Sequence, residues 1–181
     1  NKNEIVELVH NYVHPETGEL ITKERLEIKG LGKAKYILKP GGTLGDLYTN
    51  SDLVYNDDGY IEVDKNGNVA VKDDYMDDIY LGSVFPKYNL AWRNDFNYKG
   101  INLGVLFKAR IGGICYSATQ ANMDLYGVSE ASAAARDAGG VMINGRDMID
   151  AQKWYQVIGS QSGLPQYYTY SATNVRLQEL S

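Results

Sequence analysis

The chain has 181 residues, 44% of them hydrophobic, and a formal net charge of −5, values typical of a folded polar protein. The negative charge argues against nucleic acid as a partner, because phosphate binding needs concentrated Lys and Arg. Cys115 is the single cysteine, which excludes an intrachain disulfide and a zinc site built from cysteines. No run approaches the ~18 apolar residues of a membrane-spanning helix. That test does not detect barrel strands, in which every second residue faces lipid.

Residues 1–86 predict a loop-rich segment with one small hairpin. Residues 1–13 fit either a strand or a short helix, and alternating patches within residues 26–38 predict weak strands. Further along, Val and Ile residues flank Asn66-Gly67 on both sides. This pattern predicts a hairpin with a type I′ turn, because Asn-Gly readily adopts the two positive φ angles that such a turn requires.

Residues 87–116 hold the most regular pattern of the sequence and predict a long hairpin. On its first arm three aromatic residues share one parity, namely Trp92, Phe96 and Tyr98. Lys99-Gly100 supplies a tight turn. On the second arm every second position of residues 101–111 is apolar, and Leu106 is the one apolar residue on the polar side.

The length of the second arm suits a membrane strand. Eleven residues at ~3.3 Å each span ~36 Å, and a tilt of ~45° reduces this to ~25 Å, the height of a barrel's apolar band. Strands of soluble proteins are usually ~5–6 residues long, but a soluble sheet with one wet face also alternates. The periodicity alone therefore leaves a membrane strand and a long soluble hairpin equally open.

Residues 117–166 predict a long loop that contains two helices, the first capped by Ser129 and the second by Asp147. Residues 167–181 become extended again and predict the start of the next strand. Short turns on one side and long loops on the other are typical of outer-membrane barrels. The predicted fold is mainly β, made of antiparallel hairpins from a transmembrane β-barrel whose long extracellular loops contain two short helices.

Several short tracts, taken together in their order and spacing, match a known family. They are KPGGTLGDLY (39–48), DDGYI (57–61), LGSVFPKYNL (81–90), WRNDF (92–96), GG (112–113), YSATQ (116–120), YGVS (126–129), RDAGG (136–140) and ATNVRLQELS (172–181). In these tracts the chain resembles the C-terminal part of the SusC/RagA-type TonB-linked (TonB-dependent) outer-membrane transporters of Bacteroidetes.

The resemblance implies a C-terminal fragment of a barrel of roughly 22 strands, without the family's N-terminal plug and TonB-contacting segment. It implies import of oligosaccharides or peptides at the cell outer membrane, powered through the TonB complex and without a cofactor. The expected partners are a SusD-like surface lipoprotein, the TonB complex, the substrate and outer-membrane lipid. The alternative is a soluble glycan-binding β-protein of the cell surface, and a glycan-degrading enzyme ranks last.

The candidate ligand-binding residues are aromatic side chains in and after the long loop. They are Trp154, Tyr155, Tyr167 and Tyr168, with Tyr170 close by in the sequence. Aromatic faces stack on sugar rings and on peptide side chains, and the loops of a transporter face its substrate. The alternative is that Tyr155 packs its helix onto neighbouring elements and that other tyrosines form the aromatic girdle of the barrel. On the polar parity of the hairpin, Arg93, Lys108 and Arg110 would line the barrel lumen, where such residues more often pair with acids than bind substrate.

Other candidate sites are weaker. His10 and His14 could share a helix face as metal ligands, but no third ligand is evident and polar surface is favoured. Residues 64–67 faintly resemble a calcium loop but lack its glycine offset and its terminal Glu, which favours a turn. No carboxylate pair, nucleophile elbow or phosphate loop lies in a catalytic frame. The sequence therefore predicts no enzyme activity, no metal and no cofactor.

Overall fold

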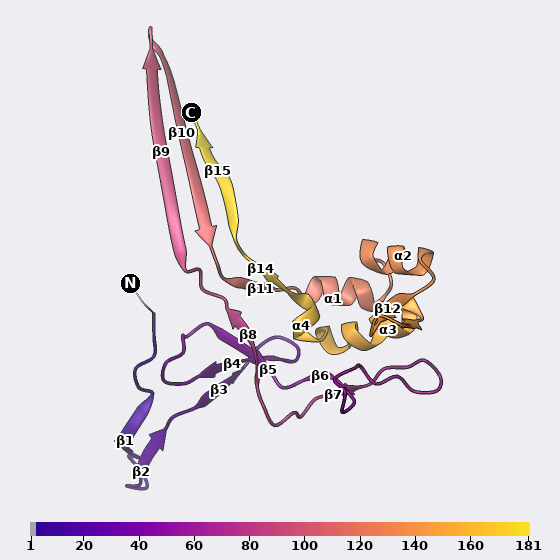
Figure 1. Ribbon diagram of the computed structural model, residues 1–181. Helices are drawn as coiled ribbons and strands as arrows, with labels where there is room; N and C mark the ends of the chain where they lie inside the picture. Colours follow the sequence, from indigo (N-terminus) through magenta and orange to yellow (C-terminus); the bar gives the residue numbers. More distant parts are fainter. Residues whose placement is uncertain (1–2) are drawn as a thin grey trace.

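The computed structural model describes residues 3–181, without the side chain of Ser162. Residues 1 and 2, which begin the first predicted segment, lie outside that range. The chain is mainly β, with 43% strand and 17% helix, and its sheets are antiparallel. Figure 1 shows a long sheet that projects from a base, a smaller sheet within that base, and a group of helices beside it. The prediction of a mainly β, antiparallel fold is confirmed.

The sheet in the base has four strands in the order β3-β4-β5-β8. They span Leu26–Lys29, Ala34–Leu38, Asp46–Thr49 and Ile79–Ser83. All four residues of β5 are buried. The Asp46 carboxylate fixes the turn before β5, because it accepts hydrogen bonds from the backbone N–H and the hydroxyl of Thr43 (2.8 and 2.6 Å). Before this sheet, β1 (Val9–Val13) and β2 (Leu20–Lys23) form an exposed hairpin, so the first segment contains a strand.

The hairpin around Asn66-Gly67 exists, but its predicted turn type is wrong. Short strands β6 (Asp52–Leu53) and β7 (Val71–Lys72) pair, and an isolated bridge joins Val63 to Val69. Gly67 has a φ of +71°, whereas Asn66 is not among the residues with positive φ. The Asp64 carboxylate accepts hydrogen bonds from the N–H groups of Asn66 and Asn68 (both 2.8 Å), which stabilises a longer turn with a single left-handed residue.

The long sheet contains three strands in the order β15-β10-β9. They span Asn174–Leu180, Ile101–Ile111 and Tyr88–Tyr98. The predicted turn at Lys99-Gly100 is confirmed: both residues have positive φ (49° and 83°), as a two-residue type I′ turn requires. Tyr98 lies directly opposite Ile101, and the pairing continues without interruption to Tyr88 opposite Ile111. The second arm therefore has the eleven residues that the pattern predicts, and the first arm is equally long.

A bulge in β15 keeps the apolar side chains of that strand on one face. Phe107 lies opposite Leu177, but the next residue, Leu106, lies opposite Glu179, so Gln178 is the extra residue. Without this extra residue, Leu180 would lie opposite Gly104, on the polar face of the sheet. With it, Leu180 lies opposite Val105, on the same face as Leu177.

The segment between β10 and β15 folds into a helical unit. Its helices α1, α2, α3 and α4 span Ala118–Leu125, Glu130–Asp137, Ala151–Gly159 and Pro165–Tyr168, and a 3₁₀ turn, η1, spans Ser160–Ser162. Its strands β11, β12, β13 and β14 span Ile114–Tyr116, Val141–Ile143, Asp147–Ile149 and Thr169–Ser171. The pair β11–β14 forms the stem through which the chain enters and leaves the unit.

Two predictions for this unit need correction. Ser129 caps α2 as expected, because its hydroxyl accepts a hydrogen bond from the N–H of Ser132 (3.0 Å). Asp147 does not cap a helix: it begins β13, which pairs with β12, and the cap of α3 is Asp150, which accepts from Lys153 N–H (3.1 Å). The unit also has four α-helices in place of the predicted two.

The main core lies between the helical unit and the β6–β7 hairpin. Its buried members are Leu53, Val69, Ala121, Ile143, Ile149, Trp154, Ile158, Leu164 and Tyr168. Lys153 Nζ and Gln166 Nε2 also donate to backbone oxygens of residues 66 and 51, which ties the hairpin to the helices. The helices and the hairpin therefore form one packed body.

None of the sheets formed by residues 3–181 closes on itself. Within the same residues, no helix is both long and apolar enough to cross a membrane.

Truncating the core should destabilise the helical unit. Leu164 is completely buried, so Leu164→Ala should lower the free energy of unfolding by about 2–5 kcal/mol through lost burial and a new cavity. Urea unfolding followed by Trp154 fluorescence, in a Trp92→Phe background, measures this. The control is Tyr126→Ala at a side chain that is 78% exposed, where a change below about 0.5 kcal/mol is expected. Equal effects of the two substitutions would contradict the assigned core.

Candidate functional site

The first functional feature is an apolar face of the long sheet. Residues directly opposite each other in antiparallel strands point to the same face, so the registers define its members. They are Leu90, Trp92, Phe96, Ile101, Leu103, Val105, Phe107, Ala109, Ile111, Val175, Leu177 and Leu180, with Tyr88 and Tyr98 at the two ends. We call this set the apolar face. Asn94 is its one polar residue.

The apolar face is open along its whole length. Trp92 is 56% exposed and Ile101 72% exposed, and Trp92 stacks on Phe107 with ring centroids 5.8 Å apart. Figure 1 shows that the sheet stands clear of the helices and of the base. An exposed apolar surface of this extent marks a surface that contacts an apolar partner.

The opposite face of the sheet is polar. Near the Lys99-Gly100 turn, Arg93 forms ion pairs with Asp95 (3.0 Å) and with Glu179 (3.6 Å), and Asn97 donates a hydrogen bond to Asn102. These side chains are largely exposed, so the pairs order the face and add little stability. Arg93 therefore pairs with acids, as expected for the three basic residues of the polar parity, whereas Lys108 and Arg110 form no ion pair within the described residues.

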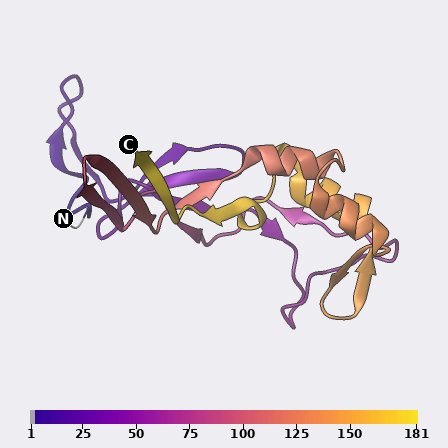
Figure 2. The same ribbon diagram turned by 90° about the horizontal axis from the view of Figure 1, so that it is seen from above.

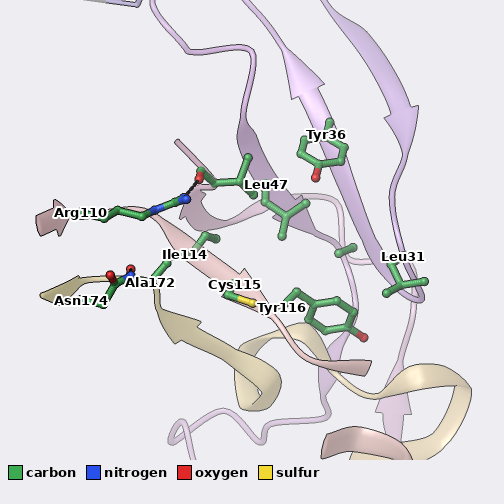
Figure 3. Close-up of a pocket in the computed structure, with 11 residues that line it drawn as sticks. Leu31, Tyr36, Leu47, Arg110, Ile114, Cys115, Tyr116, Ala172 and Asn174 are labelled. Atoms are coloured by element: carbon green, nitrogen blue, oxygen red, sulfur yellow. Dashed lines mark hydrogen bonds between the residues drawn. The ribbon is translucent and has the colours of Figure 1, made fainter. Parts of the chain in front are cut away.

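The third feature is a cavity of about 520 Å³ at the base of the long sheet (Figure 3). It lies where the β3–β4 turn, β5, β11 and the ends of β10 and β15 meet. Its lining is Leu31, Ala34, Tyr36, Leu47, Val84, Arg110, Ile114, Cys115, Tyr116, Ala172 and Asn174. A volume of this size is typical of sites for small solutes.

Arg110 reaches from the polar face of the sheet into this cavity. Its Nη2 donates a hydrogen bond to the carbonyl oxygen of Val84 (2.7 Å), which Figure 3 shows as a dashed line. Gly113, at φ +84°, makes this approach possible, because a Cβ there would lie 3.1 Å from Arg110 Nη2 and 3.2 Å from the Val84 oxygen. Arg110 Nε is buried and has no hydrogen-bond partner within the described residues.

The aromatic residues predicted to bind ligand lie in or against the core. Trp154 and Tyr168 are 6% and 1% exposed, and Trp154 meets Tyr167 edge-to-face at 5.8 Å. Tyr155 and Tyr167 are half-buried against the same cluster. The geometry favours the packing alternative for Trp154 and Tyr168, because a ligand has no access to their rings. Ligand contact by Tyr155 and Tyr167 stays a prediction, and Tyr170 is the most exposed of the group.

The other candidate residues have ordinary structural roles. His14 Nδ1 accepts hydrogen bonds from the N–H groups of Glu16 and Thr17 (both 3.3 Å), so it stabilises the turn between β1 and β2. His10 is exposed and lies 3.8 Å from a carboxylate oxygen of Glu7. Within residues 3–181, no three His, Cys, Asp or Glu side chains gather in a way that could hold a metal ion.

The sequence pattern indicated the two faces of the hairpin but not the cavity. The cavity combines residues 31–47 with residues 110–116 and 172–174, which are far apart in the chain. No protein-family model matches the chain, and no curated protein matches it.

The buried tyrosines should make the helical unit sensitive to alkali. Burial raises the pKa of Tyr168, with Asp124 adding to the effect, and burial likewise raises the pKa of Tyr167. Because the folded pKa lies above the unfolded value of about 10, the stability from the neutral phenol is fully present below that pH and is lost as pH rises above it.

Tyr168→Phe should reduce this alkaline loss. Each such phenol contributes up to about 1.4 kcal/mol per pH unit to the slope of unfolding free energy against pH. The variant should show a smaller slope above pH ~10, and its stability at pH 7 should change by less than about 1 kcal/mol, because the hydroxyl has no well-placed hydrogen-bond partner within the described residues. Urea unfolding at several pH values measures both, with the exposed Tyr126→Phe as the control. An unchanged slope in Tyr168→Phe would contradict the conclusion that the buried phenol of Tyr168 causes part of the alkaline loss of stability.

Proposed function

We propose that the chain forms part of the wall and an outer loop of an outer-membrane β-barrel, within a TonB-linked transporter that imports oligosaccharides or peptides. The observation that carries this proposal is the apolar face. It is continuous over three neighbouring strands, and the face behind it is polar except at Ala91, Gly104 and Leu106. Lipid on one side and a wet interior on the other require this division.

The dimensions of the sheet support a membrane location. The two eleven-residue strands, at ~3.3 Å per residue and a tilt of ~45°, cover ~25 Å, which matches the apolar band of a barrel. Tyr88 and Tyr98 stand at the two ends of β9, where a barrel places its aromatic girdles. Trp92 and Phe96 lie between them on β9, at intermediate depth in the proposed bilayer.

The connections at the two ends of the sheet support the same proposal. One end has the two-residue turn at Lys99-Gly100, whereas at the other end the chain leaves β10 and returns in β15 only after the whole helical unit. Barrels have short periplasmic turns and long extracellular loops. Within the described residues, the outer edges of β9 and β15 have no strand partner, and a bilayer requires such edges to be paired. We infer that further barrel strands pair there.

The transporter class and its partners come from the resemblance of the sequence tracts to SusC/RagA-type proteins. In this proposal the helical unit lies outside the cell, where a SusD-like lipoprotein and the substrate approach, and the TonB complex acts on another part of the assembly. The alternative, a soluble glycan-binding β-protein, would need another element to cover the apolar face.

The two tryptophans provide a direct test of the lipid face. In Trp154→Phe the remaining Trp92 lies on the apolar face, and in Trp92→Phe the remaining Trp154 lies in the core. In vesicles of acyl-brominated phosphatidylcholine, Trp92 fluorescence should be strongly quenched, and aqueous iodide should have little effect. Trp154 should respond weakly to both quenchers because it is buried. Quenching of Trp92 by iodide, without quenching by the brominated lipid, would overturn the membrane proposal.

A charge should be costly on one face and tolerated on the other. Val105→Lys places an ammonium group on the apolar face near mid-height and should destabilise the membrane-inserted form by about 2–4 kcal/mol. The matched control is Leu106→Lys, one residue further along on the polar face, which should cost less than about 1 kcal/mol. Unfolding from vesicles in guanidinium chloride measures both. Equal costs would mean that both faces of the sheet are in the same environment, contrary to the proposal that one contacts lipid and the other water.

A further inference from the structure

Three basic side chains gather on the polar face at the end nearest the base: Lys108, Arg110 and Arg176. The registers place Lys108 directly opposite Arg176 on β15 and opposite Ala91 on β9. They place Arg110 opposite Asn174 and Asn89. The immediate cross-strand neighbours are therefore basic or neutral, and we call these three residues the basic row.

The basic row lacks the compensation found elsewhere on the same face. Arg93 pairs with both Asp95 and Glu179, and those acids lie nearer the Lys99-Gly100 turn. Among residues 3–181, neither Lys108, Arg110 nor Arg176 forms an ion pair. Like charges directly opposite each other destabilise a sheet. An anion held between Lys108 and Arg176 would remove this repulsion.

Arg110 gives an independent indication of a ligand. One nitrogen of its guanidinium is fixed by the carbonyl of Val84, so the side chain is oriented, yet its buried Nε has no partner within the described residues. Buried polar groups of proteins are nearly always hydrogen-bonded, so an exception calls for an explanation. A guanidinium with a free N–H beside other cations is a typical carboxylate or phosphate binder.

The basic row borders a hollow next to the cavity described above. A hollow of about 280 Å³ contains Asn89, Lys108, Arg110, Asn174 and Arg176 in its lining, and it shares Arg110 and Asn174 with the larger cavity. Figure 3 shows Arg110 and Asn174 on one side of the cavity and Tyr36, Tyr116 and Leu31 on the other. Arg110 and Asn174 thus lie between two neighbouring hollows, one bordered by cationic groups and amides and the other by aromatic rings.

We propose that the basic row and the cavity bind an oligosaccharide that bears carboxylate groups, such as a chain of uronic acids. The guanidinium and ammonium groups bind its carboxylates, the amides of Asn89 and Asn174 bind its hydroxyls, and the tyrosine rings contact its sugar faces. This inference rests on the proposed function, because it takes the polar face as the interior of the transporter and names the class of solute that passes.

Calorimetric titration of the full chain in detergent micelles tests the proposal with defined sugars. A galacturonic acid trisaccharide should bind at least about tenfold more tightly than the neutral galactose trisaccharide, as the loss of one charge-assisted hydrogen bond predicts. Salt should weaken binding of the acidic sugar, since the basic row is partly exposed to solvent. Equal binding of the two sugars would overturn the proposal. Inorganic phosphate binding as tightly as the acidic trisaccharide would also overturn it, in favour of a simple anion site.

Variants locate the binding on the basic row. Lys108→Gln and Arg176→Gln should each weaken binding of the acidic trisaccharide about tenfold. The matched control is Arg93→Gln, which removes the same charge from the same face but from a residue already paired with acids. Arg176→Lys keeps the charge and should bind within about threefold of the unmodified chain, so it tests the site even if a Gln variant fails to fold. An equal loss in Arg93→Gln would overturn the assignment.

The sugar titration and the tryptophan quenching separate the two proposals. If Trp92 contacts lipid but the acidic trisaccharide does not bind, the membrane assignment stands and the substrate class is wrong. If the trisaccharide binds while Trp92 is open to iodide and untouched by lipid, the transporter proposal fails and the site belongs to a soluble sugar-binding protein.

Discussion

The register of the long hairpin is the constraint on which the rest of the structure depends. Lys99 and Gly100 both adopt positive φ, and this leaves a single pairing in which Tyr98 faces Ile101. A slip of one residue would carry every apolar side chain of one strand to the polar face, because side chains alternate with period two. The turn therefore decides which surface is apolar, where Arg110 enters the cavity, and which cations become neighbours.

The two faces of the long sheet differ in how their side chains are arranged. On the apolar face, apolar side chains follow one another across all three strands, and the bulge at Gln178 keeps both Leu177 and Leu180 on this face. On the polar face, positive and negative charges are balanced near the turn, where Arg93 has two acidic partners. Near the base the positive charges have no such partners within the described residues. If the basic row binds an acidic sugar as proposed, the half of the polar face near the turn is structural and the half near the base binds the ligand.

The sequence predicted those features that depend on neighbours in the chain. Alternation and a Lys-Gly turn are local signals, so the sequence predicts the second arm with its correct eleven residues and the turn at its correct place, and the Ser129 cap is equally local. The prediction that Asp147 caps a helix is wrong because Asp147 begins a strand that pairs with Val141–Ile143. A helix-cap motif carries no information about such a pairing. Trp154 and Tyr168 were grouped by spacing alone, whereas their burial depends on contacts with Leu53 and Val69, about a hundred residues earlier. The cavity was missed for the same reason, since its walls come from three distant segments.

The stem formed by β11 and β14 has a further consequence. Ile114 lies directly opposite Ser171, so the chain leaves the long sheet and returns to it at one point. Of residues 117–168, none pairs with β9, β10 or β15. Insertions, deletions or exchange within the helical unit would therefore leave the strand pairing of the long sheet unchanged. In the proposed barrel, the surface outside the cell and the segment in lipid can therefore diversify at different rates within one polypeptide.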